Sequence, residues 1–293
     1  MRFTKMQGAG NDYVYVNCLE ERVDNPSSLA RMVSDRHFGI GSDGLILIRP
    51  SVQADFFMEM FNADGSRSEM CGNGIRCVGK YVYDHGLADK TELAVNTLAG
   101  VKRLGLHVEG GAVAEVTVDM GAPVLDAALV PVMSATRQVV AQPIEVAGRR
   151  FEATCVSMGN PHAVVFVDDV AGFPVEEVGA AFEVHPAFPN RTNVEFVQVA
   201  SRSEANMRVW ERGTGETLAC GTGACAAAVA GVLCGKFDDE VLLHVPGGDL
   251  RVRWDRAADR VYLTGPAETV FEGDIDVDGC PPDEPPHAVD PNW

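Results

Sequence analysis

The chain has 293 residues, of which 46% are hydrophobic and 23% are charged, and its formal net charge is −18. This length suits two domains of about 150 residues, and the composition is that of a globular protein. A surface this acidic repels phosphate backbones and anionic lipids, so we expect neither nucleic acid nor a membrane as a partner. The longest apolar run has 11 residues, about half of what a membrane-spanning helix needs. The N-terminal segment lacks the apolar stretch of a secretory signal, which predicts a cytoplasmic protein.

Short segments rich in β-branched and aromatic residues, each bounded by turn residues, recur along the chain and predict strands. In chain order the predicted strands are Tyr13–Asn17, Gly44–Ile48, Phe57–Asn62, Val113–Met120, Ala163–Val167, Val194–Val199, Met207–Glu211, Val241–Val245 and Val261–Thr264. Two segments predict helices, Gly72–His85 and Gly221–Cys234, and each is followed by a glycine that suits a helix end. The second segment is apolar on every side, which is typical of a helix buried all round.

The chain matches itself at a single offset. At a shift of 149 residues, Asn11 coincides with Asn160, and the segment CGNGIRC that begins at Cys71 coincides with CGTGACA at Cys220. Several collinear matches at one offset indicate an ancient duplication. The sequence therefore predicts an α+β fold of two pseudo-symmetric domains, each with strands wrapped around a central helix.

The duplication also predicts the domain limits. We expect the first domain to span residues 1–121 and the second residues 122–265, with a last strand, 266–278, returning to the first domain. Residues 279–293 include five prolines and are expected to form a flexible tail.

The cysteines lack the spacing of a metal site. The chain has no CxxC or HExxH motif and its seven histidines are scattered, so we predict no metal site. In a cytoplasmic chain of this length free thiols are the expectation, and catalysis is one reason to keep particular ones. Of the eight cysteines, only Cys71 and Cys220 are superimposed by the duplication. The others are Cys18, Cys77, Cys155, Cys225, Cys234 and Cys280.

Cys71 and Cys220 each stand directly before a predicted helix, where backbone N–H groups lack partners and the helix dipole is positive. Both effects favour a thiolate, so we expect thiol pKa values below the ordinary value of about 8.5. The neighbouring glycines let the backbone approach an anion such as a carboxylate closely. The structural alternative is a glycine-rich turn with a buried, inert cysteine, and the repetition of the motif argues against it.

Two related halves commonly face each other across a ligand, which would place the two thiols on opposite sides of it. Inversion of a carbon stereocentre by proton transfer needs such a pair, because one base removes a proton from one face and an acid returns a proton to the other. The helix N-termini would hold the carboxylate on which charge develops. We therefore predict a small-molecule substrate and no cofactor.

Six distinctive segments occur in the order KMQGAGNDYVYVN, GIGSDGLILI, FNADGSRSEMCGNGIRC, SMGNPHAVVF, RTNVEF and WERGTGETLACGTGACAAA. With them the chain resembles the diaminopimelate epimerase family, from residue 1 to about residue 276. The resemblance implies an isomerase that interconverts LL- and meso-diaminopimelate without pyridoxal phosphate, in the biosynthesis of lysine and peptidoglycan precursors. It also implies a homodimer.

The resemblance carries roles to particular residues. Cys71 and Cys220 correspond to the two catalytic bases, with Cys220 taking the proton from the LL isomer, and His162 and Glu211 correspond to residues that modulate the thiol pKa values. Each of these residues also has a purely structural interpretation when it is taken alone. His162 could be a half-buried core histidine, and Glu211 and Arg212 could form an exposed ion pair. Each asparagine could be a turn or cap residue. The substrate-binding positions implied are Asn11, Asn62, Gly72, Asn73, Asn160, Asn193, Glu211, Arg212, Gly221 and Thr222.

One position departs from the family pattern, because this chain has Gly44 where some members carry Gln. Three alternatives stay open. A proline or hydroxyproline racemase or epimerase has the same fold and paired cysteines, but its small cyclic substrate has no distal carboxylate for Arg212. A non-enzymatic binding module would not require two cysteines in register. An NAD-dependent oxidoreductase would rest on the segment Gly221-x-Gly223-x-x-Ala226 alone.

Overall fold

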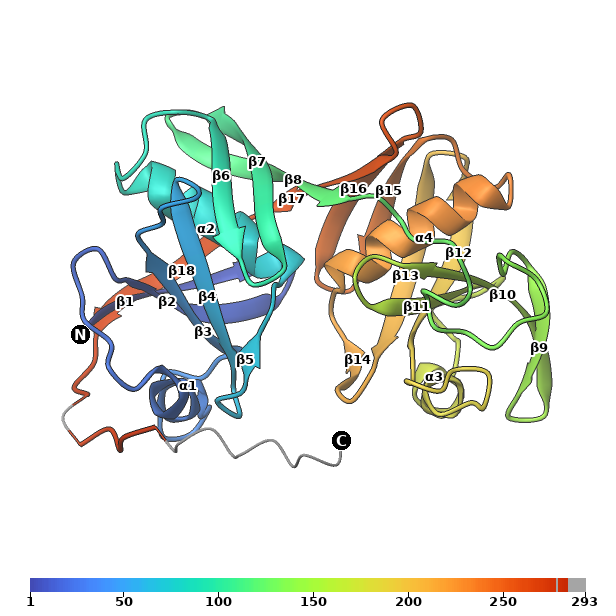
Figure 1. Ribbon diagram of the computed structural model, residues 1–293, viewed down its shortest axis with the longest axis horizontal. Coiled ribbons are helices and arrows are strands. Elements are labelled where there is room, and N and C mark those ends of the chain that lie inside the picture. The colour runs from blue at the N-terminus through green and yellow to red at the C-terminus, as the bar shows by residue number, and fades with distance from the viewer. Residues whose placement is uncertain (278, 284–293) are drawn as a thin grey trace.

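The structure is a computed structural model that describes residues 1–277 and 279–283. Two lobes of similar build lie side by side (Figure 1). In each lobe strands wrap around one helix, α2 (Gly72–Asp84) in the first lobe and α4 (Gly221–Leu233) in the second. The predicted α+β fold with two pseudo-symmetric domains around central helices is therefore confirmed.

In the first lobe, two pairs of strands with parallel pairing lie beside α2. Strands β2 and β3 pair in parallel, β3 and β4 pair antiparallel, and β4 pairs in parallel with β6. The elements of this lobe besides α2 are β1 (Arg2–Gly8), β2 (Asn11–Asn17), α1 (Pro26–Ser34), β3 (Gly44–Arg49), β4 (Phe56–Asn62), β5 (Arg67–Ser68), β6 (Glu92–Thr97), β7 (Gly100–Glu109) and β8 (Ala112–Gly121).

The second lobe repeats this order. Strands β11 and β12 pair in parallel, β12 and β13 antiparallel, and β13 and β15 in parallel. Helices α1 and α3 begin 149 residues apart, as do α2 and α4, so the duplication extends to elements that the sequence did not predict. The remaining elements are β9 (Gln142–Val146), β10 (Arg149–Ser157), β11 (Pro161–Phe166), α3 (Val175–Glu183), β12 (Asn193–Ser201), β13 (Glu204–Glu211), β14 (Gly215–Thr217), β15 (Glu240–Val245), β16 (Gly248–Asp255), β17 (Arg260–Pro266) and β18 (Glu268–Asp274).

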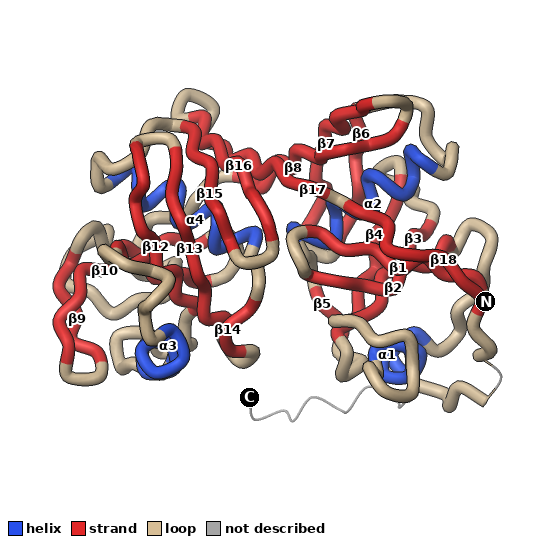
Figure 2. Tube along the Cα trace, turned by 180° about the vertical axis from the view of Figure 1, so that it is seen from behind, coloured by secondary structure: helices blue, strands red, loops and turns tan. Residues whose placement is uncertain are grey.

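Two strand pairings tie the lobes together. Strand β17 of the second lobe pairs antiparallel with β8 of the first, with Leu263 opposite Val118, and Figure 2 shows this pair bridging the lobes. The chain then returns to the first lobe, where β18 pairs antiparallel with β1. Beyond β18, Asp283 accepts hydrogen bonds from the backbone N–H groups of Ser27 (3.2 Å) and Ser28 (2.7 Å) at the start of α1. Residues 278 and 284–293 of the predicted last strand and tail lie outside the described residues.

The two predicted helices form, and each ends one residue before its predicted end. Each of the nine predicted strands overlaps an observed strand. Helices α1 and α3, of nine residues each, were not predicted, although Pro26 at the start of α1 and Glu176 and Glu177 in the first turn of α3 are typical of helix starts. Both are held by the apolar face that they bury against the neighbouring strands.

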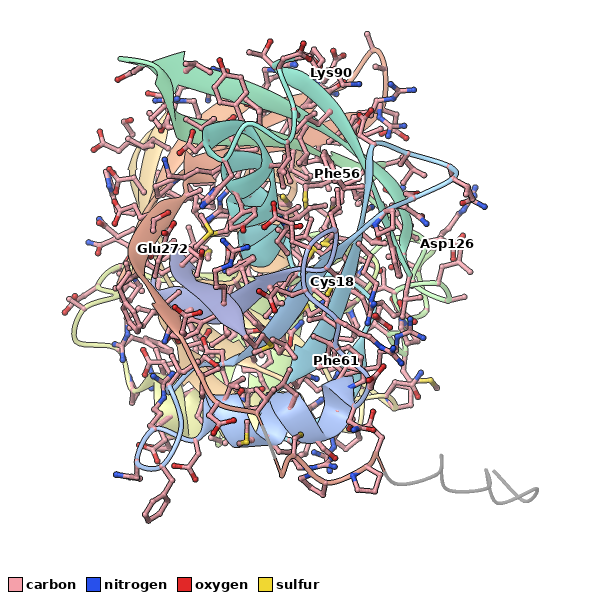
Figure 3. All side chains as sticks on the ribbon, turned by 90° about the vertical axis from the view of Figure 1, so that its left-hand side faces the viewer. Cys18, Phe56, Phe61, Lys90, Asp126 and Glu272 are labelled. Carbon is pink, nitrogen blue, oxygen red and sulfur yellow. The ribbon has the colours of Figure 1, made fainter. Side chains whose placement is uncertain are left out.

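The largest hydrophobic core runs through both lobes and contains α2 and α4. Small side chains such as Ala224, Ala227 and Ala230 let strands approach α4 from every side, and all three are fully buried. Separate cores lie under α1 and α3. Phe56 belongs to the α2 core and Phe61 to the α1 core, and Figure 3 shows these two ends of β4 near the two helices.

None of the helices in the described part of the chain combines the length and the apolar content that crossing a bilayer requires.

Gly231 of α4 tests how tightly this helix is enclosed. A Cβ atom built on Gly231 would lie 2.0 Å from Cδ2 of the buried Phe237. Alanine gains about 1 kcal/mol of helix propensity over glycine, whereas overpacking of a core costs about 1–3 kcal/mol. We therefore expect Gly231→Ala to lower the free energy of unfolding in urea, and Phe237→Leu in the same chain to recover part of the loss. A gain in stability from Gly231→Ala alone would contradict the packing described for α4.

Candidate active site

Cys71 and Cys220 occupy equivalent places at the N-termini of α2 and α4. Each has an extended backbone and is the N-cap residue of its helix, and each Sγ accepts a hydrogen bond from the N–H of the glycine three residues on. The N–Sγ distance is 3.4 Å in both cases, from Gly74 and from Gly223. The repeated CGxG segment therefore builds the same thiol-capped helix start twice.

The two helix starts meet where the lobes meet, and both helices direct these ends toward the boundary between the lobes (Figure 1). A Cβ atom built on Gly221 would lie 3.6 Å from Cα of Gly72, which is van der Waals contact, so the backbones of the two helix starts lie close together. Nδ2 of Asn73 donates to the carbonyl of Ala219 at 3.3 Å, which links the residue before Cys220 to the first turn of α2. We call this contact the glycine seam (Gly72, Asn73, Ala219 and Gly221).

On the first-lobe side, Cys71 contacts a chain of polar groups. Its Sγ donates to Oδ1 of Asn11 at 3.2 Å, and Nδ2 of Asn11 donates to Oδ2 of Asp43 at 2.8 Å. Asp43 also accepts from the guanidinium of Arg36 at 3.0 Å. Sequence reasoning missed Asp43, although it directly precedes a predicted strand in the segment GSDG, where a carboxylate can reach the strand's neighbours.

On the second-lobe side, Cys220 lies near two carboxylates. Its Sγ is 3.4 Å from Oγ1 of Thr222. Glu211 accepts from Oγ1 of Thr217 at 2.5 Å, and its charge raises the pKa of both Cys71 and Cys220. The other carboxylate, Glu195, was missed by sequence reasoning; its only signal is an acidic residue inside the apolar run NVEFV.

His162 is fully buried rather than half-buried. Its Nδ1 lies 2.7 Å from Oε1 of Glu195 and its Nε2 lies 2.9 Å from Oδ1 of Asn160. Strand pairing places His162 of β11 opposite Asn193 of β12. The predicted residues His162, Asn160 and Asn193 are thus neighbours on one side of the second lobe.

The expectation of lowered thiol pKa values is wrong for both cysteines. Burial raises the pKa of Cys71, and the N–H groups of Gly74 and Asn73 lower it by less than burial raises it. Burial raises the pKa of Cys220 well above its ordinary value, and the charges of Glu211 and Glu195 add to the rise. The helix N-terminus acts in the predicted direction, but removal of water from a thiolate is the larger effect. Burial also raises the pKa of Glu211 itself.

The remaining predicted residues surround these groups. Oδ1 of Asn193 accepts from the backbone N–H of Arg212 at 2.7 Å. The guanidinium of Arg212 is exposed and donates to the carbonyl of Asn190 at 3.0 Å. Asn62 donates to Oγ of Ser66 at 2.9 Å. The fold therefore brings Asn193, Glu211 and Arg212 together, since Arg212 directly follows the end of β13.

Gly44 has a structural reason to be glycine. It pairs with Asn62 across β3 and β4, and a Cβ atom on it would lie 2.1 Å from the carbonyl oxygen of Phe61. A glutamine side chain has no room here, so any contact at this place comes from the backbone or from neighbours such as Asn62.

The surface also has shallow hollows that are unrelated to the thiols. One of about 710 Å³ is lined by Asp239 and residues 253–257. Another of about 550 Å³ is lined by residues 173–177, Arg208 and Glu216. None of these residues belongs to the predicted site, so the chemistry of the side chains at the glycine seam identifies the candidate site.

A family model described as diaminopimelate epimerase matches residues 3–125 and 154–270. A diaminopimelate epimerase from Agathobacter rectalis is 57% identical over 284 residues, which cover 94% of this chain and 100% of the relative. One from Methanococcus maripaludis is 53% identical over 277 residues, with 94% and 100% covered. The chain belongs to the diaminopimelate epimerase family.

Solved structures that share the fold are more distant in sequence. A probable proline racemase from Agrobacterium radiobacter has a TM-score of 0.69 at 15% identity, covering 94% of this chain and 93% of that one. A PhzF-family phenazine biosynthesis protein from Bacillus anthracis has a TM-score of 0.69 at 16% identity, covering 94% and 99%. The proline racemase alternative is therefore matched in fold alone. Membership of the diaminopimelate epimerase family makes the chain an isomerase, in place of the oxidoreductase and binding-module alternatives.

The buried thiols make stability depend on pH. Burial raises the pKa of Cys225 in α4 to about 12, against the lowering effect of Arg76 and Lys102. Below an unfolded-state pKa of about 8.5 both states keep the proton, and above it only the folded state does. The free energy of unfolding is therefore expected to fall as the pH rises above this value. Cys225→Ala should make that fall shallower by up to about 1.4 kcal/mol per pH unit.

Urea unfolding at about pH 8 and about pH 10.5 measures this difference. Val229→Ala is the matched control, because it removes a buried side chain from the same helix without removing a titratable group. It should lower stability equally at both pH values. An unchanged pH dependence in Cys225→Ala would contradict the raised pKa.

Proposed function

We propose that the chain interconverts LL- and meso-diaminopimelate by a two-base proton transfer at one α-carbon, in the biosynthesis of lysine and peptidoglycan precursors. The observation that carries the proposal is the pair of equivalent thiols, Cys71 and Cys220, each capping a helix at the glycine seam. The proposed reaction uses neither pyridoxal phosphate nor a metal ion, because the two thiols supply both proton transfers.

In the proposed reaction the Cys220 thiolate removes the α-proton of the LL isomer, and the Cys71 thiol delivers its proton to the opposite face of the planar carbon. The enzyme then holds a Cys220 thiol and a Cys71 thiolate, which is the state that the reverse reaction needs. Burial supports this role, because a thiol of raised pKa is a stronger base once ionised. Removal of a weakly acidic α-proton benefits from such a base.

We propose that the first turns of α2 and α4 hold the reacting carboxylate. Negative charge grows on that carboxylate as the α-carbon becomes planar, and N–H groups at helix N-termini stabilise it. Gly72, Asn73, Gly221 and Thr222 supply these groups, and they lie beside the two thiols that they serve.

Diaminopimelate has an amino-acid group at each end, and only one centre inverts. The distal end must therefore be read stereospecifically, with a cation for its carboxylate and acceptors for its ammonium. We propose that Arg212 and Glu211 fill these roles together with amide groups of Asn62 and Asn193. Asn11 and Asn160, which the duplication superimposes, are proposed to contact the substrate nearer the thiols.

The remaining organisation is proposed on the family resemblance. We infer a cytoplasmic homodimer whose protomer has one domain of residues 1–121 and 266–278, a second of residues 122–265, and a tail of residues 279–293.

Incubation with LL-diaminopimelate in heavy water tests the proposal directly. We expect the meso isomer to form with deuterium at the inverted α-carbon, without added pyridoxal phosphate or metal. Cys71→Ala and Cys220→Ala should each lower kcat by about 10²–10⁴-fold or more, because each removes one proton-transfer group. Mass spectrometry and chiral chromatography measure both quantities.

Cys18→Ala is the control variant and should leave kcat unchanged, since Cys18 packs against the core under α1, which is separate from the core that contains α2 and α4. Circular dichroism checks that the three variants fold. Full activity in either Cys71→Ala or Cys220→Ala would contradict the two-base mechanism, and a requirement for an added cofactor would contradict the proposed chemistry.

A further inference from the structure

Three side chains form a series of hydrogen bonds, from Glu195 through His162 to Asn160. The side chains of Glu195 and His162 are both fully buried. One ring nitrogen of His162 faces the Glu195 carboxylate at 2.7 Å, and the other faces Oδ1 of Asn160 at 2.9 Å. Asn160 is half-buried, and it is one of the residues proposed to contact the substrate.

The hydrogen-bond partners of His162 indicate where the protons of these two hydrogen bonds lie. Asn160 Oδ1 is only an acceptor, so Nε2 of His162 must carry a proton. A second proton must lie between Nδ1 and the carboxylate, because two unprotonated acceptors would not approach to 2.7 Å. Oδ1 of Asn160 is held, and its Nδ2 stays available as a donor.

Asn11, the first-lobe residue that the duplication superimposes on Asn160, has the opposite end of its amide group held by a neighbouring residue. Nδ2 of Asn11 donates to the Asp43 carboxylate, which can only accept, and Oδ1 of Asn11 accepts from the Cys71 thiol. The duplicated asparagines thus present opposite ends of their amides. Asn11 offers an acceptor beside one thiol, whereas Asn160 offers a donor.

The fold itself does not need a carboxylate at position 195. The position that corresponds to Glu195 in the first lobe is Ile46, which is also fully buried and packs against Gly74 as Glu195 packs against Gly223. Oε2 of Glu195 has no hydrogen-bond partner among the described residues. A buried carboxylate with an unpaired oxygen is costly, so an apolar residue would serve stability better.

We propose that Glu195 is a positioning residue: acting through His162, it fixes the amide of Asn160 so that Nδ2 donates to a substrate oxygen. The inference rests on the proposed epimerase function. The charged and titratable groups that face the Glu195–His162 pair are Glu211 on β13, Cys220 at the start of α4 and Cys155 on β10.

The protons can be observed without substrate. In protein labelled with ¹⁵N-histidine, the signals of His162, assigned with His162→Gln, should show a proton on the ring nitrogen Nε2. Glu195→Gln should shift the signal of Nδ1, because this nitrogen loses its carboxylate partner. Glu204→Gln is the matched control, because Glu204 also contacts a histidine, His244, at 2.9 Å on the exposed surface. An unprotonated Nε2 on His162 of the unaltered chain would overturn the inference, even if epimerase activity is present.

Kinetics test the route through Asn160. Glu195→Gln should lower kcat/KM for diaminopimelate by about 10–100-fold, as misplacement of a binding group does, while Glu204→Gln leaves it unchanged. In an Asn160→Ala background, Glu195→Gln should have no further effect, because its target is gone. Equal losses in both backgrounds would overturn the inference and indicate a purely structural role. Absence of turnover in the unaltered chain would instead overturn the proposed function, and the NMR result would still show whether Nε2 of His162 carries the proton that holds Asn160.

Discussion

The contact between two helix N-termini at the glycine seam is the constraint on which the site depends. A Cβ atom on either Gly72 or Gly221 would be in van der Waals contact with the other glycine, and Asn73 donates a hydrogen bond across the boundary to the carbonyl of Ala219. Two cysteines that cap these helices are thereby brought to one place from opposite lobes. The wrapped strands, the buried apolar α4 and the β8–β17 crossing all serve to fix this contact.

The two lobes share the same backbone fold but differ in the charged residues near their cysteines. In the first lobe Tyr13 and Ile46 occupy the positions that His162 and Glu195 occupy in the second. As a result Cys220 faces more negative charge than Cys71, and burial together with that charge raises its pKa further. A symmetric frame with unequal surroundings suits a reaction that treats two faces of one carbon differently.

The sequence predicted the parts of the fold that repeat or that stand on a local pattern. The CGxG segments, the glycines after each helix and the all-apolar α4 are local signals, so the duplication, both central helices and the two thiols could be inferred. Helices α1 and α3 carry only start signals, such as Pro26 and Glu176, and their nine residues are too few for a clear periodic pattern, so they were missed. The domain limits and the roles of the site residues stay predictions.

Other features depend on contacts between distant segments. Asp43 contacts Asn11 and Glu195 contacts His162, and in each case the partner comes from a neighbouring strand. The sequence around Asp43 or Glu195 does not indicate which residue will be its partner. The thiol pKa values were predicted in the wrong direction because the helix N-terminus is visible in the sequence and burial is not. Gly44 became interpretable only once Phe61 was found across β3 and β4.

The central claim is that Cys71 and Cys220 face each other across one substrate atom. Mild oxidation of the substrate-free protein, followed by peptide mapping, tests it most directly, because a disulfide forms only between cysteines whose backbones lie within about 7 Å. We expect a Cys71–Cys220 disulfide, with activity lost on oxidation and recovered on reduction. Disulfides among the other cysteines, with Cys71 and Cys220 left as free thiols, would contradict the facing arrangement.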